Sequence, residues 1–263
     1  MKNILDEIAD KTRERIELEK EGTEIQVLLQ QIEERKQNPA PKMSFREALL
    51  KEGMSYICEV KKASPSKGVI AEDFPYLDIA LEYEKAGASA ISCLTEPFYF
   101  QGADQYLWEI AGRVSIPVLR KDFVVDEYMI YQAKALGASA VLLICSILDD
   151  AELKDFRQLA EELEMDALVE AHDETEVERA VACGAKIIGV NNRDLKTFEV
   201  DMNNSIRLRK AAPDSVIFVS ESGIRTHEDI VRLRENNISA VLIGETLMRS
   251  TVKKGMLSKL DNG

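Results

Sequence analysis

A carboxylate and an ammonium stand two residues apart at the end of an apolar stretch that reads YICEVKK. Side chains alternate between the two faces of a β-strand, so Ile57, Glu59 and Lys61 share one face. Taking two such charges out of water costs on the order of several kcal/mol per ion, which a purely structural site seldom tolerates. The pattern therefore indicates acid–base chemistry at the end of this strand. An exposed ion pair on an edge strand is the alternative interpretation.

Seven more apolar runs of strand length follow, each separated from the next by a helical segment. Apolar strands that alternate with helices are typical of parallel βα units, in which the strands are buried on both faces. Glycine ends the helix before a strand in KAGASA (85–90), KALGASA (134–140) and ACGAKI (182–187), where it supplies a left-handed C-cap. The eight runs are YICEVKK, ASAISCLTE, IPVLRKD, SAVLLICS, DALVEAH, KIIGVNN, SVIFVSES and SAVLIGE.

Eight such units in 263 residues favour an α/β fold, the (β/α)8 or TIM barrel, which takes about 250 residues. A doubly wound open sheet is the alternative, but the glycine-rich dinucleotide turn is missing after the first strand. We expect one domain over residues 1–263, of which residues 1–53 form an N-terminal helical extension. That extension either braces one end of the barrel or closes over a site. The sequence favours bracing, because no unusual polar cluster lies in the extension.

Polar side chains gather at the carboxyl ends of the predicted strands. In a barrel these ends face one mouth, where the chemistry of this fold takes place. Singly each residue is a weak signal, since Lys121 could be a solvated loop lysine and Asn191 could hold a turn. His172, one strand-step past Glu170, is expected beside the site or at the surface. The strand ends supply Glu59, Lys61, Lys121, Glu170, Asn191, Arg193, Glu221, Ser222, Gly223, Gly244 and Glu245.

Glycines follow the seventh and eighth strands. Loops at these two positions commonly bind phosphate in barrels, and glycine lets backbone N–H groups approach the anion. Gly223 and Gly244, with the Ser222 hydroxyl, fit such a site. Two ordinary turns are the alternative.

Composition excludes several classes of function. The net charge of −13 would repel nucleic acid and anionic membranes, although grouped lysines could bind an anionic small molecule. No apolar run approaches the ~20 residues of a membrane helix, and the N-terminus is too charged for a signal peptide, which predicts a cytoplasmic protein. The two histidines and four cysteines lack metal-type spacing, so no metal is expected, and the cysteines are expected to be buried. The acidic surface favours a monomer.

Six segments in a fixed order resemble the indole-3-glycerol-phosphate synthase family of tryptophan biosynthesis: EVKKASPSKG, LRKDF, ALVEAH, GVNNRDL, SESGI and LIGETLMR. The resemblance runs from the first strand to the eighth and includes the helical extension. EVKKASPSKG is its most specific segment, whereas SESGI is shared with other phosphate-binding barrels. Cys58, where the family often has alanine, lies on the outward face. The family closes an indole ring on 1-(2-carboxyphenylamino)-1-deoxyribulose 5-phosphate, losing CO₂ and water without a cofactor.

The resemblance implies a role for each charged residue. Lys121 would be the general acid on the ribulose carbonyl, and Glu170 would handle proton transfer in the dehydration. Lys61 would hold the substrate carboxylate and serve as a further proton donor, while Glu59 and Asn191 would orient ring closure. Two lysines in one mouth would also lower each other's pKa. Ser222 is counted as catalytic, and the implied substrate-binding residues are Phe100, Phe123 and Leu142 in the apolar pocket, Gly223, Gly244 and Glu245 with Ser222 around the phosphate, and Ser64 and Glu221.

Two other functions stay open. A different barrel enzyme on a ribulose-phosphate-like substrate, an isomerase or a Schiff-base aldolase, would keep the phosphate site and use Lys121 or Lys61 as a nucleophile. A non-catalytic barrel would bind a phosphorylated metabolite without turnover. The EVKKASPSKG segment argues against the first, and the full acid–base set argues against the second.

Overall fold

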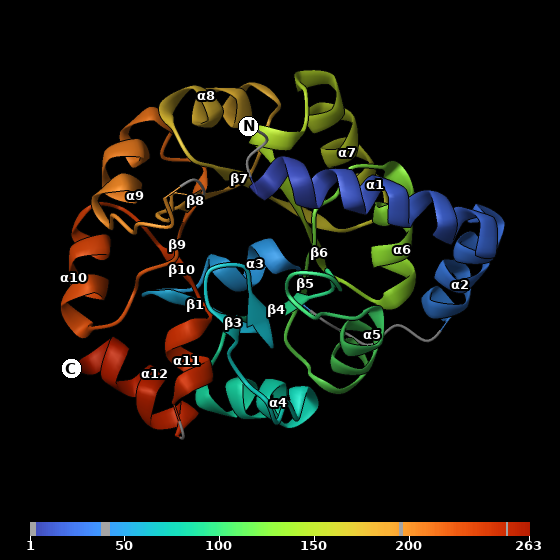
Figure 1. The fold of residues 1–263 in the computed structure, drawn as a ribbon. Helices are drawn as coiled ribbons and strands as arrows, with labels where there is room; N and C mark the ends of the chain where they lie inside the picture. Colours follow the sequence, from blue (N-terminus) through green and yellow to red (C-terminus); the bar gives the residue numbers. More distant parts are fainter. Residues whose placement is uncertain (1–3, 38–42, 195–196, 251) are drawn as a thin grey trace.

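Eight parallel strands form a closed barrel in the order β1-β10-β9-β8-β7-β6-β5-β4 (Figure 1). This is a computed structural model, which describes residues 4–37, 43–194, 197–250 and 252–263. Because β1 pairs with β10 on one side and with β4 on the other, the sheet has no edge, and the predicted (β/α)8 barrel is confirmed. The barrel strands are β1 (Ser55–Val60), β4 (Ala90–Leu94), β5 (Val118–Lys121), β6 (Ala140–Ile144), β7 (Asp166–Ala171), β8 (Ile187–Asn191), β9 (Ile217–Glu221) and β10 (Ala240–Ile243).

Helices cover the outside of the barrel between successive strands (Figure 1). Gly87 and Gly137 end α4 and α6 with φ of 101° and 92°, as the glycine joints predicted. In the described part of the chain, no helix is both long and apolar enough to cross a membrane. The outer helices are α4 (Tyr76–Ala86), α5 (Asp104–Arg113), α6 (Glu127–Leu136), α7 (Asp150–Glu162), α8 (Glu174–Ala182), α9 (Asn203–Leu208), α10 (His227–Glu235), α11 (Glu245–Arg249) and α12 (Lys253–Asn262), with short 3₁₀ turns at Cys145–Ile147 and Arg209–Ala211 and a small hairpin of β2 (Ala63–Ser64) and β3 (Gly68–Val69).

Side chains alternate between two apolar cores along each strand. Ile57 belongs to the core inside the barrel, whereas Cys58 and Val60 belong to the core between the strands and the helices. All four cysteines are buried, as expected. A residue two positions after an inner core residue points to the same side, so Lys121 continues the row of Leu119 at the mouth. The inner core therefore lies directly below the polar side chains at the strand ends.

The N-terminal extension contains α1 (Ile4–Gly22), α2 (Ile25–Gln37) and α3 (Phe45–Leu49). The third of these helices lies at the amino end of the barrel. Phe45 and Leu49 are buried in the inner core, and the Arg46 amide donates to the Asp166 carboxylate (2.8 Å) at the start of β7. The predicted bracing of one end is therefore confirmed for α3.

The first helix occupies the opposite end. Figure 1 shows α1 crossing the rim of the ring of strands beside β6 and β7, and its Leu5 and Ile8 join the inner core. Ion pairs fasten it to the loop after β5, between Arg15 and Asp122 (3.0 Å) and between Lys20 and Asp126 (2.6 Å). The expectation that the whole extension only braces the barrel is wrong for α1, because these long-range ion pairs hold it over the mouth.

Candidate active site

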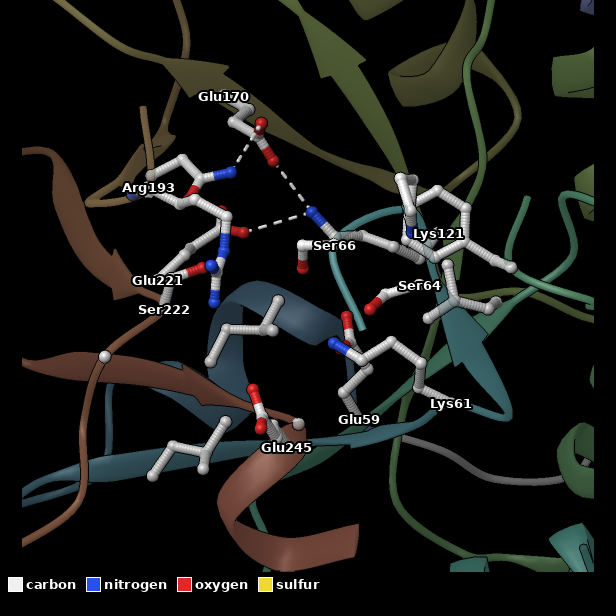
Figure 2. A pocket seen from close by; sticks show the side chains of 18 of the residues that line it. Glu59, Lys61, Ser64, Ser66, Lys121, Glu170, Arg193, Glu221, Ser222 and Glu245 are labelled. Atoms are coloured by element: carbon white, nitrogen blue, oxygen red, sulfur yellow. Dashed lines mark hydrogen bonds and ion pairs between the residues drawn. The ribbon is translucent and has the colours of Figure 1, made fainter. Parts of the chain in front are cut away.

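A cavity of about 500 Å³ opens at the carboxyl ends of the barrel strands (Figure 2). Its walls come from strand ends, from the loops that follow them and from α1. All fourteen residues predicted for the site line it: Glu59, Lys61, Ser64, Phe100, Lys121, Phe123, Leu142, Glu170, Asn191, Glu221, Ser222, Gly223, Gly244 and Glu245. The tertiary structure thus gathers into one cavity side chains that lie as far apart in the chain as residues 59 and 245.

Lys121 lies at the centre of the charged groups. Its Nζ is 2.7 Å from Glu170 Oε2 and 3.0 Å from Glu221 Oε2, and Figure 2 shows these two contacts from facing strand ends. Burial alone would lower the pKa of the Lys121 ammonium, but the carboxylates, Glu170 first, outweigh burial and raise that pKa well above its usual range. The expected lowering of the pKa by a second lysine is therefore wrong for Lys121, because carboxylates surround this ammonium.

The carboxylates that flank Lys121 differ in their ionisation. Burial alone would raise the pKa of Glu170, but Lys121 and then His172 hold it well below its usual range. Asn191 Nδ2 adds a contact to Glu170 Oε1 at 3.4 Å. Burial, with Glu170 nearby, raises the pKa of Glu221 to about 7 although Lys121 opposes the shift. The site thus pairs a carboxylate whose pKa is held low with one whose pKa lies near neutrality.

Two glycines make room for the glutamates. A Cβ on Gly189 would lie 2.2 Å from Glu221 Oε1, which has no hydrogen-bond partner among the described residues. A Cβ on Gly244 would lie 2.2 Å from Glu59 Oε1 and 2.8 Å from Lys61 Nζ. A larger residue at either position would therefore displace the neighbouring charged side chains.

Glu59 and Lys61 form an ion pair beneath the start of α11. Glu59 is buried, and β1 is hydrogen-bonded on both sides within the closed barrel. The alternative of an exposed pair on an edge strand is therefore wrong. Lys61 lines the cavity together with Ser64 of β2 and Ser66 of the turn that follows β2 (Figure 2).

The chain turns sharply after β9. Ser222 and Gly223 have φ of 67° and 90°, and a Cβ on Gly223 would lie 2.5 Å from Val200, so this turn excludes larger side chains. The Asn192 amide donates to the Ser222 carbonyl at 3.1 Å and holds the turn. Next to it Glu245, the first residue of α11, pairs with Arg249 at 3.1 Å. Polar groups of two successive strand ends thus surround one side of the cavity.

Aromatic and aliphatic side chains also line the cavity. The rings of Phe100 and Phe123 lie 6.2 Å apart, and Leu142 and Leu5 complete an apolar wall. The Glu96 carboxylate holds the aromatic loop by accepting the backbone N–H groups of residues 98, 99 and 100, at 2.9, 2.7 and 2.9 Å. The cavity therefore presents an apolar surface as well as charged groups, as an aromatic substrate with anionic groups would require.

A model of the family described as "Indole-3-glycerol phosphate synthase" matches residues 5–260. The chain is 54% identical over 257 residues to the indole-3-glycerol phosphate synthase of Ruminiclostridium cellulolyticum, with 98% of each chain covered. It is 51% identical to that of Lacticaseibacillus paracasei, with 97% of each covered. The chain belongs to the indole-3-glycerol phosphate synthase family. Members of this family are decarboxylating lyases of tryptophan biosynthesis.

Solved structures of other barrels agree in fold alone. A 3-hexulose-6-phosphate synthase from Salmonella typhimurium superimposes with a TM-score of 0.65 at 13% identity, covering 79% of this chain and 97% of that one. A second 3-hexulose-6-phosphate synthase gives 0.64 at 15% identity, with 79% and 98% covered. The family of this chain therefore follows from the sequence relatives, and the solved structures add the barrel.

Several residues of the synthase site were not predicted for it. Ser66, Arg193, Arg225 and Arg249 also line the cavity. Arg193 stood among the strand-end residues and Ser66 within EVKKASPSKG, so both had a signal in the sequence. Leu5 and the rest of the α1 wall had none, because an apolar helix face carries no information about which end of a barrel it covers.

Proposed function

We propose that this chain catalyses ring closure of 1-(2-carboxyphenylamino)-1-deoxyribulose 5-phosphate to indole-3-glycerol phosphate, with loss of CO₂ and water. One observation carries the proposal beyond family membership. Lys121, Glu170, Glu59 and Lys61 meet in a single cavity that has an apolar wall and a glycine-bordered polar end. Such a cavity suits a substrate with an aromatic carboxylate at one end and a phosphate at the other.

Lys121 is the general acid of ring closure in this proposal. The aromatic carbon that carries the carboxylate attacks the ribulose carbonyl carbon, and Lys121 gives a proton to the carbonyl oxygen. The carboxylate then leaves as CO₂ and restores the aromatic ring. Support comes from the contact of Lys121 with Glu170 at 2.7 Å and from its raised pKa, which keeps the ammonium protonated until substrate arrives.

Glu170 accepts a proton in the dehydration that follows, and Lys61 donates one to the departing hydroxyl. Before that step Lys61 pairs with the substrate carboxylate, while Glu59 and Asn191 orient the reacting atoms. Support comes from the lowered pKa of Glu170, which leaves it ionised as a base, and from the Glu59–Lys61 ion pair. The cationic ends of both lysines also offset the negative charge of the substrate.

The phosphate binds at the ends of β9 and β10. Backbone N–H groups at Gly223 and Gly244 and the Ser222 hydroxyl are the donors in this proposal, and Arg225 and Arg249 add positive charge. Support comes from their shared position along one side of the cavity. Glu245 contributes through its contact with Arg249, whose guanidinium it holds at 3.1 Å. Glu221 and Ser64 complete the contacts to the sugar.

Indole fluorescence after addition of the carboxyphenylamino substrate tests the function directly. Lys121→Ala and Glu170→Gln should each lower kcat by ~10² or more, because each removes an acid–base group. Lys85→Ala, which changes an exposed lysine of α4, is the matched control and should keep wild-type turnover. Near-wild-type turnover of both site variants would refute the roles, and no fluorescence from the wild-type chain would refute the function.

Cooperative unfolding, oligomeric state and location belong to the same proposal. A single domain over residues 1–263 should unfold in one transition in urea. A monomer should sediment at the 29.5 kDa of one chain. Cell fractionation tests the cytoplasmic location. A dimer mass or two separate unfolding transitions would contradict the corresponding part.

A further inference from the structure

His172 lies between two carboxylates just beyond the end of β7. Its Nε2 is 3.3 Å from Glu170 Oε1, and its Nδ1 is 3.0 Å from Glu176 Oε2. All three side chains are largely withdrawn from solvent, with 19% of His172, 14% of Glu176 and 4% of Glu170 exposed. The imidazole thus lies within ion-pair distance of both the carboxylate of the cavity and a carboxylate of α8.

The Glu176 carboxylate is itself held in place. Asp173, the N-cap of α8, accepts a hydrogen bond from the Glu176 amide at 2.9 Å, which fixes the first turn of the helix. The same Glu176 oxygen that meets the His172 ring also accepts the His172 backbone N–H, at 2.8 Å. Ring and backbone of His172 are therefore anchored by one oxygen, and the ring has little freedom to turn away from Glu170.

His172 does not line the catalytic cavity. Glu170 lines that cavity, whereas His172 and Glu176 line a neighbouring one of about 640 Å³, and Asn191 and Arg193 line both. Of the two carboxylates beside His172, Glu170 is therefore the one that lines the catalytic cavity. The role of His172 in this position rests on the role proposed above for Glu170.

We propose that His172, clamped by Glu176, is a positioning residue that keeps the Glu170 carboxylate oriented and ionised during turnover. Lys121 supplies the other cation beside Glu170, and it gives up its proton in the ring closure proposed above. At that stage His172 is the cation left in contact with Glu170. Without it the buried carboxylate would take up a proton and lose its basicity.

The charges around His172 agree with this role. Burial alone would lower the pKa of His172, but Glu170 and Glu176 outweigh burial and raise it to about 10, so the ring is an imidazolium near neutrality. Beyond these two carboxylates, the charged groups that face it are Lys121 across Glu170, and Asp173, Arg193, Asp194, Glu199, Asp201 and Arg207 around the neighbouring cavity.

Two variants separate positioning from simple structural support. His172→Gln keeps a polar side chain but removes the positive charge, and we expect kcat to fall ~10-fold or more with KM within ~2-fold. The acidic limb of the kcat profile should move to higher pH, because the pKa of Glu170 rises. Glu176→Gln keeps the imidazole but lowers its pKa, so activity should gain an alkaline limb at which the ring deprotonates. His227→Gln, which changes the second of the two histidines, is the control.

NMR of the histidine rings gives a readout that needs no turnover. In His227→Gln the one remaining histidine signal is that of His172. Its pKa should lie far above the ordinary value of about 6.5 and should fall when Glu170→Gln or Glu176→Gln is added. A midpoint that neither change moves would overturn the inference, as would an acidic limb in His172→Gln that coincides with the wild type. If His172→Gln does not fold, the Glu176→Gln profile and the NMR midpoints decide. Failure of the proposed function would instead show as absent indole formation in the wild type and in His227→Gln alike.

Discussion

Replacing Gly244 with alanine tests how closely the charged pair of β1 must be placed. The backbone φ of −112° at Gly244 is negative, as alanine prefers, so the added methyl acts chiefly through its neighbours. It would lie 2.2 Å from Glu59 Oε1 and 2.8 Å from Lys61 Nζ, where carbon–oxygen contact normally begins at about 3.4 Å. The Glu59 carboxylate must therefore move by about 1 Å. A displacement of that size in a reacting group costs ~10²-fold in rate, or about 2.7 kcal/mol of transition-state stabilisation.

The fold should survive this change. The three atoms nearest to the methyl belong to the ends of two flexible side chains, so the free energy of unfolding should drop by about 1–3 kcal/mol, the usual cost of overpacking. Gly112→Ala in α5 is the matched control. Apart from its chain neighbours and the backbone of its own helix, no atom of the described residues lies within 4 Å of a Cβ there, and alanine in a helix is favoured over glycine by about 1 kcal/mol.

Indole fluorescence at varied substrate concentration measures kcat and KM, and urea unfolding measures stability. Gly244→Ala should lose ~10² in kcat/KM, while Gly112→Ala keeps wild-type activity and gains stability. If Gly244→Ala stays within ~3-fold of the wild type, the reasoning from the Glu59–Lys61 geometry is refuted.

Three further changes test the electrostatics. Lys121→Met leaves Glu170 and Glu221 without their shared cation. The free energy of unfolding should therefore fall by about 3 kcal/mol near pH 8, and by less near pH 5, where the unpaired carboxylates of the variant take up protons. Urea titrations that show an equal loss at both pH values would contradict this. The wild-type KM should rise about 5-fold from pH 6 to pH 8, because Glu221, with a pKa of about 7, becomes negative beside an anionic substrate. Glu221→Gln should remove that rise, and an equally steep rise of KM in the variant would exclude Glu221 as its source. Arg15→Met removes the contact of 3.0 Å between Asp122 and α1, so it should raise KM more than it lowers kcat and lower the free energy of unfolding by about 2 kcal/mol. An unchanged KM would show that α1 stays in place without the Arg15–Asp122 pair.

The predictable part of the site depended on strand periodicity. Glu59 follows Ile57 by two residues and Lys121 follows Leu119 by two, so each had to continue an inward-facing row once the runs were recognised as strands. Parallel strands in a closed barrel then bring their carboxyl ends to one mouth. These two local rules, applied to eight short runs, placed the charged strand ends at one mouth, whereas Ser64, Phe100, Phe123 and Leu142 were implied by the family resemblance.

Other features depended on distances that no local pattern encodes. The sign of the pKa shift at Lys121 was predicted wrongly, because its nearest neighbours are Glu170 and Glu221 at 2.7 and 3.0 Å and not a second lysine. The clamp of His172 by Glu176 depends on how the first turn of α8 meets the end of β7.

The amino-acid sequence by itself determined the barrel, its strand-end acids and bases, and the family, because hydrophobic alternation and motif order are properties of the linear chain. The tertiary structure alone decided which charges pair, which carboxylate has a pKa near neutrality, and that α1 lies across the rim of the mouth while α3 lies at the opposite end. The physical reason is that an apolar helix face such as Leu5 and Ile8 fits many surfaces. Its place is chosen by ion pairs such as Arg15–Asp122, whose partners stand 107 residues apart.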